Sequence, residues 1–118
     1  MPAFAQDDRM GADEFRISCA SCHGLDAKGD GPIASYLTVA PPDLTMLAKN
    51  NRGEYPFLKV FQIIDGRSVV RAHGNDMPVW GDRYRTAVEA PGSIGSQEQM
   101  IRARVLELVY YIQTIQEK

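Results

Sequence analysis

The interpretation of this 118-residue sequence starts from Cys19-Ala20-Ser21-Cys22-His23. These five residues contain both cysteines of the chain and one of its two histidines. Two residues separate the cysteines, and the histidine follows the second cysteine directly. Any chemistry that depends on a cysteine must therefore take place in this stretch.

The stretch has the C-x-x-C-H pattern, which is typical of covalent attachment of c-type haem. One helical turn and the bend after it place two thiols beneath the two vinyl groups of the porphyrin, and each thiol can form a thioether there. His23 then directs its imidazole at the iron from the proximal side. We therefore predict one haem c, bonded through Cys19 and Cys22, with His23 as a ligand of the iron.

Three other interpretations compete with haem attachment: a thioredoxin-like redox pair, half of a zinc site, and two buried thiols without chemistry. A zinc site needs two more Cys or His ligands, and outside the motif only His73 remains. A thioredoxin-like pair follows a strand, whereas the residues before Cys19 predict a helix. Haem attachment is the interpretation we prefer.

A sixth ligand of the iron comes either from His73 or from a methionine. The methionines are Met1, Met10, Met46, Met77 and Met100. Met77 is our choice, because it follows the loop sequence Gly74-Asn75-Asp76 and because Pro78 fixes the backbone just beyond it. His73 remains the alternative and would give a bis-histidine site.

Composition favours one globular domain without nucleic-acid or membrane-spanning features. Hydrophobic residues make up 44% and charged residues 24%, and the net charge of -2 provides no basic surface for nucleic acid. No apolar run reaches the eighteen or so residues that a membrane-spanning helix needs. We expect residues 8–118 to form a single domain and residues 1–7 to be a signal-peptide remnant or a disordered tail, because Ala3-Phe4-Ala5 matches the A-x-A cleavage pattern of exported proteins. The expected location is the periplasm.

The sequence predicts helices and long loops, since no window alternates over the length of a strand. The expected helices cover residues 8–20, 43–48 with Asp43 as cap, 56–65 with Gly66 as the stop, and 96–115. The last helix is the most regular, with Ser96 and Gln99 in a capping-box pattern. Residues 24–42 and 66–95 are expected to be mostly loop, with at most one turn of helix in the second.

Several of these features together resemble the bacterial class I monohaem cytochromes c, over about residues 8 to 115. They are Gly11, Phe15, Cys19, Cys22, His23, Gly24, Gly31, Pro32, Met77, Pro78 and Tyr111-Ile112. The resemblance implies an all-α fold in which the first and last helices cross around one covalently bound haem. It also implies that Gly11 permits the close approach and that Phe15 meets Tyr111.

The resemblance implies further residue roles near the haem. A proline carbonyl accepts a hydrogen bond from the second nitrogen of the proximal histidine, and Pro32 is the position expected to do so. Arg67 and Trp80 are expected to contact the haem propionates or the pocket. Residues 81–95 are more than compact family members need, and they are either a docking surface or structural filler.

In function, the resemblance implies a monomeric, non-enzymatic periplasmic carrier of one electron with His23 and Met77 as axial ligands. Its partners are then redox proteins, namely a periplasmic dehydrogenase, oxidase or reductase. One alternative is a haem subunit dedicated to one such enzyme. A second is a ligand-binding or peroxidatic haem protein in which the iron has an open position.

Overall fold

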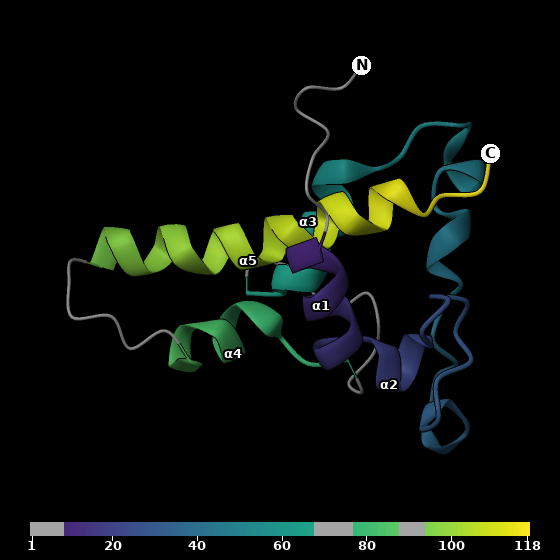
Figure 1. The fold of residues 1–118 in the computed structure, drawn as a ribbon, viewed down its shortest axis with the longest axis horizontal. Coiled ribbons are helices and arrows are strands. Elements are labelled where there is room, and N and C mark those ends of the chain that lie inside the picture. Colours follow the sequence, from purple (N-terminus) through teal and green to yellow (C-terminus); the bar gives the residue numbers. More distant parts are fainter. Residues whose placement is uncertain (1–8, 68–76, 88–93) are drawn as a thin grey trace.

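A computed structural model describes residues 9–67, 77–87 and 94–118, and all regular structure within these ranges is helical (Figure 1). The α-helices are α1 (Arg9–Ser18), α2 (Ala20–His23), α3 (Phe57–Asp65), α4 (Trp80–Ala87) and α5 (Ile94–Thr114). Three short 3-10 turns lie between α2 and α3: η1 (Ala34–Tyr36), η2 (Leu44–Met46) and η3 (Lys49–Asn51). The expected all-α class is confirmed for these residues. None of their helices has the length and apolar composition needed to cross a membrane.

The first helix crosses the last one at very short range (Figure 1). A Cβ atom added at Gly11 would lie 2.4 Å from the Glu107 carbonyl oxygen and 2.8 Å from the Tyr111 Cβ, so only glycine fits there. One turn further along α1, the ring of Phe15 lies 5.3 Å from that of Tyr111. Both contacts that the resemblance implied between α1 and α5 are present.

The core forms around the apolar face of α5. Five apolar residues recur at helical spacing in this region: Ile101, Val105, Leu108, Ile112 and Ile115. The first four are buried, and Ile115 is half-buried against the core. Phe15 from α1, Val60 and Ile64 from α3, and Tyr84 from α4 pack into the same cluster. The long helix is thus the element against which α1, α3 and α4 are placed, and they in turn position the loops around the motif.

Two helix ends follow the local sequence as expected. Gly66 adopts a left-handed conformation with φ of 72° and donates its N–H to the Gln62 carbonyl, which ends α3. The Asp43 carboxylate accepts a hydrogen bond from the Thr45 N–H at 2.9 Å. The segment that it caps, however, consists of the 3-10 turns η2 and η3, not of one helix to Ala48.

Other boundaries differ from the prediction. The helix expected to reach Ala20 ends at Ser18, and α2 begins at Ala20. The final helix starts at Ile94, two residues before the predicted Ser96, whose side chain lies outside the described part. The largest error is α4, because at most one turn of helix was expected there. Its eight residues are mostly polar, and Tyr84 is the buried side chain that ties it to the core, so the sequence shows little apolar period.

Candidate cofactor site

A cavity of about 460 Å³ lies between α2, the loop before η2, α3 and the start of α4. It brings together five of the seven predicted site residues, which are Cys19, Cys22, His23, Met77 and Trp80. The remaining lining is mainly apolar: Ser18, Leu37, Val39, Ala40, Pro41, Pro42, Leu47, Lys59, Ile63 and Pro78. Its size and composition match those of cofactor sites, which are usually apolar and enclose roughly 300–1,000 Å³.

The motif takes its shape from backbone hydrogen bonds between near neighbours. The Cys19 N–H donates to the Phe15 carbonyl at 2.8 Å, which continues α1 into the motif. The N–H groups of Cys22 and His23 both donate to the Cys19 carbonyl, at 3.2 and 2.9 Å. This single turn directs both cysteines and the histidine to one cavity. Both cysteines are free thiols, with Cys19 buried and Cys22 half-buried.

The surroundings of Cys19 are those of a buried thiol that is not activated. Burial, together with the nearby Glu14 and Cys22, raises the pKa of the Cys19 thiol to about 12. Redox-active and metal-binding cysteines act as thiolates and need a lowered pKa. Cys19 therefore lacks the lowered pKa of an activated redox cysteine. In addition, the described part of the chain contains no group of three or more His, Cys, Asp and Glu side chains placed to hold a metal ion.

His23 is buried, and its ring is oriented by a proline carbonyl. The Nδ1 atom lies 3.3 Å from the carbonyl oxygen of Pro42, a distance that suits a weak hydrogen bond donated by Nδ1–H. Such a bond fixes the tautomer and raises the basicity of the other nitrogen. Nε2 is then the atom with which His23 would hold an iron.

This contact corrects the prediction for Pro32. The expected type of acceptor is present, but it belongs to Pro42. Pro32 lines a separate open hollow on the other side of α2, together with Ala20 and Ser21. It is held there because the Gly31 N–H donates to the Cys22 carbonyl and the Ile33 N–H to the Ser21 carbonyl.

Met77 and Trp80 form a second wall of the cavity, which the motif residues also line. Met77 is half-buried and packs against the core, and Trp80 begins α4. The Trp80 ring lies 5.7 Å from the Tyr84 ring, and the Arg83 guanidinium lies 5.4 Å from the Trp80 centroid. The expectation that Trp80 contacts the pocket agrees with this placement. The competing ligand, His73, lies outside the described residues.

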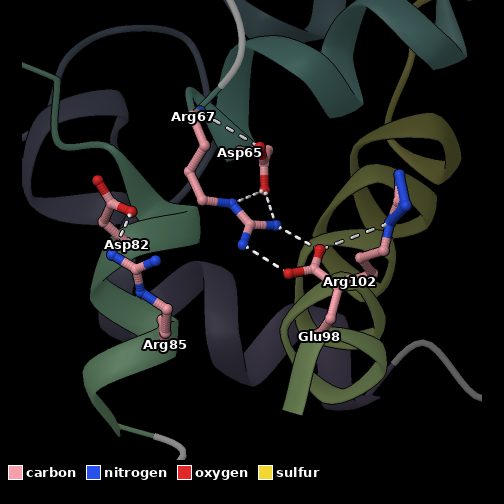
Figure 2. Close-up of polar contacts among 6 residues, drawn as sticks. All are labelled: Asp65, Arg67, Asp82, Arg85, Glu98 and Arg102. Carbon is pink, nitrogen blue, oxygen red and sulfur yellow. Dashed lines mark hydrogen bonds and ion pairs between the residues drawn. The ribbon is translucent and has the colours of Figure 1, made fainter. Parts of the chain in front are cut away.

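Arg67 does not line the cavity, which departs from its predicted role beside the haem. Its Nε donates to Asp65 at 2.9 Å, and its two terminal nitrogens each donate to one Glu98 oxygen at 2.8 Å (Figure 2). The hydrogen bonds to Glu98 and Asp65 raise the pKa of Arg67 above its already high ordinary value. We call Asp65, Arg67 and Glu98 the Arg67 cluster. It connects the end of α3 to the first turns of α5.

A second polar group, which the sequence did not reveal, involves Tyr84 of α4. Glu14 of α1 accepts hydrogen bonds from Ser18, from Tyr84 at 2.9 Å and from Arg104 at 2.8 Å. The Arg104 guanidinium also lies 4.0 Å from the centroid of the Tyr84 ring. This Glu14 network joins α1, α4 and α5, and Ser18 also lines the cavity. Its partners are 70 and 90 residues from Glu14, so no local pattern indicated it.

The donor set of the cavity fits a covalently attached haem. Two thiols and an imidazole come from one turn, a thioether comes from a distant segment, and the walls between them are apolar. Comparison with known proteins found no matching family model, no curated relative and no similar solved structure. Function is therefore inferred from the motif and from the geometry of the cavity.

Proposed function

We propose that this chain is a c-type cytochrome that carries one electron at a time on a single haem bonded to Cys19 and Cys22. The observation that carries the proposal is that the C-x-x-C-H residues and Met77, far apart in the sequence, line the same apolar cavity. A cysteine pair by itself also suits a redox or metal site, and a half-buried methionine by itself is usually core packing. Their meeting in one cavity supports a site built around a group with two sulfur attachment points and two axial positions.

In this proposal the residues of the chain bind the haem, orient its ligands and keep substrate from the iron. Cys19 and Cys22 tether the group, and the Pro42 carbonyl fixes the His23 ring for ligation through Nε2. The Met77 thioether would be the second protein ligand of the iron, and it would leave no position open to substrate. Haem, when bound, supplies Fe(III)/Fe(II) cycling, and thioether ligation favours the ferrous state and raises the reduction potential.

The helix crossing supports the finer proposal of a class I cytochrome c fold. In the described residues, Gly11 allows α1 to approach α5, and Phe15 meets Tyr111 beside the turn that carries the motif. We propose that residues 8–118 form this one domain and that it acts as a monomer in the periplasm. Its partners are redox proteins, and it has no catalytic function of its own.

The test is expression together with a haem-attachment system, followed by intact mass and a haem stain on a denaturing gel. We expect a mass equal to the polypeptide plus one haem and a stained band. Cys22→Ala should leave at most one thioether and weaken or abolish the stain. Ser21→Ala, an exposed residue between the cysteines, is the matched control and should stain like the parent. A colourless parent with the mass of the bare polypeptide would refute the proposal.

A further inference from the structure

The Arg67 cluster contacts the start of α4 at Gly81, four residues after Met77. Asp65 and Arg67 are well buried, with side chains 9% and 20% exposed. Arg67 fills the space between Asp65 and Glu98, and it uses both edges of its guanidinium group (Figure 2). These charges stabilise the junction of α3 and α5, and α4 begins next to that junction.

The backbone at the start of α4 rests on this ion pair without an intervening side chain. A Cβ atom added at Gly81 would lie 2.4 Å from the Arg67 Nε and 2.5 Å from an Asp65 carboxylate oxygen. A Cβ atom added at Gly66 would lie 3.2 Å from the Val79 Cγ1. The residues on either side of Trp80 are thus in contact with the cluster and with the end of α3.

The same segment is joined rigidly to Met77. The N–H groups of Asp82 and Arg83 donate to the Val79 carbonyl, at 3.1 and 3.2 Å, which makes Val79 part of the first turn of α4. Pro78 restricts the backbone between Val79 and Met77. A displacement of Gly81 or Val79 is therefore passed on to Met77, with little freedom to absorb it.

We propose that Arg67 is a positioning residue for Met77, which it holds against the cavity through the contact of the Arg67 cluster with Gly81. The inference rests on the proposed function, since it assumes that Met77 is an iron ligand. It gives Arg67 a role that differs from the expected haem contact. A ligand that is held in place before it binds is lost less readily to a competitor, because less conformational freedom has to be restricted.

The geometry requires arginine at this position. A planar guanidinium presents two parallel N–H donors to one carboxylate and a third donor to another. Lysine carries the same charge as a single point and cannot reproduce the fork that joins Glu98 to Asp65. Removal of Arg67 also leaves Asp65 buried without this partner, so the support of Gly81 is lost along with the charge.

The experiment measures how easily Met77 is displaced from the ferric protein by added imidazole. Arg67→Gln is the test variant, and Arg67→Lys shows whether charge alone suffices. Arg85→Gln is the matched control, because the Asp82–Arg85 pair is exposed and lies on α4, the helix that contains Gly81 (Figure 2). We expect Arg67→Gln to bind imidazole roughly tenfold more tightly, because a larger fraction of molecules no longer holds Met77 on the iron. Arg67→Lys should behave like Arg67→Gln, and Arg85→Gln should match the parent.

A second variant covers the case in which Arg67→Gln does not fold. Gly81→Ala leaves every charge in place but forces the α4 backbone away from Arg67, so it should also tighten imidazole binding. The haem stain and the helical circular dichroism should be those of the parent in each variant.

The outcomes separate this inference from the proposed function. A parent protein without covalent haem contradicts the function itself. Covalent haem with the sulfur-to-iron absorption band, combined with parental imidazole affinity in both Arg67→Gln and Gly81→Ala, overturns only the positioning role. An equal effect of Arg85→Gln overturns it as well, since an exposed arginine outside the Arg67 cluster would then act in the same way as Arg67.

Discussion

The two walls of the cavity are held in place by different kinds of interaction. The motif wall, formed by Cys19 to His23, is shaped by backbone hydrogen bonds to residues close in sequence, such as that from Cys19 to Phe15. The methionine wall, formed by Met77 to Trp80, is next to two groups of side-chain hydrogen bonds between residues far apart in the sequence. These are the Arg67 cluster, between the end of α3 and α5, and the Glu14 network, between α1, α4 and α5. The proposed attachment site is thus local, whereas the position of Met77, the proposed sixth ligand, depends on contacts between residues far apart in the sequence.

Removal of Met77 should have the largest effect, and it should affect the methionine wall without affecting the motif wall. Met77→Ala removes the thioether, so the sulfur-to-iron band of the ferric protein should disappear and the reduction potential should fall. Covalent haem should remain, because the motif wall does not depend on Met77. Absorption spectra and a redox titration check both effects. His73→Ala is the control and should preserve spectrum and potential; if it alone removes low-spin character, the ligand is histidine.

The Glu14 network should be the next most sensitive point, and it affects stability. Glu14→Gln keeps the shape of the side chain but removes the charge that accepts bonds from Tyr84 and Arg104, and we expect a loss of about 1–3 kcal/mol in the free energy of unfolding. Denaturant titration measures it. Asp13→Asn is the matched control, since Asp13 is exposed and its ion pair with Arg16 is long, at 3.8 Å, and weak. A similar loss in both variants would show that the network contributes nothing special.

A smaller loss is expected at Asp43, next to the proline whose carbonyl contacts the motif wall at His23. Asp43 caps the turn that follows Pro42 by accepting bonds from the Thr45 N–H and hydroxyl, at 2.9 and 2.6 Å. Asp43→Ala should cost about 1 kcal/mol of unfolding free energy, the usual effect of a lost cap. Asp43→Asn keeps an acceptor and should recover most of it. If Asp43→Ala costs more than Glu14→Gln, the two walls differ less than we infer.

The smallest effect should be a change in how steeply the free energy of unfolding depends on pH. Burial alone would raise the pKa of Glu14, but bonds donated by Ser18, Arg104 and Tyr84 outweigh it and hold the pKa below the ordinary 4.5. The folded state therefore favours the carboxylate, and this stability is complete above the unfolded pKa and is lost as the pH falls through the folded pKa. The stability of the parent should fall more steeply than that of Glu14→Gln between about pH 6 and pH 3. Parallel curves would contradict the assignment.

The parts of the structure that depend on near neighbours were predictable from the sequence. The apolar period of the last helix predicted four of its buried residues, although it missed Val109. Gly66 predicted the end of α3, and Asp43 predicted a cap. The motif predicted three residues of the cavity lining for the same reason, because their spacing on one turn determines their common direction.

The parts that depend on distant partners were not predictable. Whether the carbonyl beside His23 belongs to Pro32 or Pro42 depends on how the loop folds back, and both prolines stand in turn-rich sequence. Arg67 is a suitable haem partner by residue type, yet Glu98, 31 residues later, takes two of its donors. The helix α4 was missed because, among its described side chains, Tyr84 and Trp80 are the apolar ones that pack into or against the core, and two residues at a spacing of four give little sign of a period.

Gln116 places a constraint on the order in which the protein matures. Its amide donates to the Leu44 carbonyl at 2.6 Å and accepts from the Ala48 N–H at 2.8 Å, across 72 and 68 residues of sequence. The segment it holds begins at Leu44, two residues after Pro42, so a residue that follows α5 secures the loop that orients His23. During synthesis the motif emerges early and can form its turn alone, whereas a contact across such a distance forms late. If the chain carries haem as proposed, its thiols would be accessible before the Gln116 contact forms, and that contact would then fix the part of the cavity wall that contains Leu47.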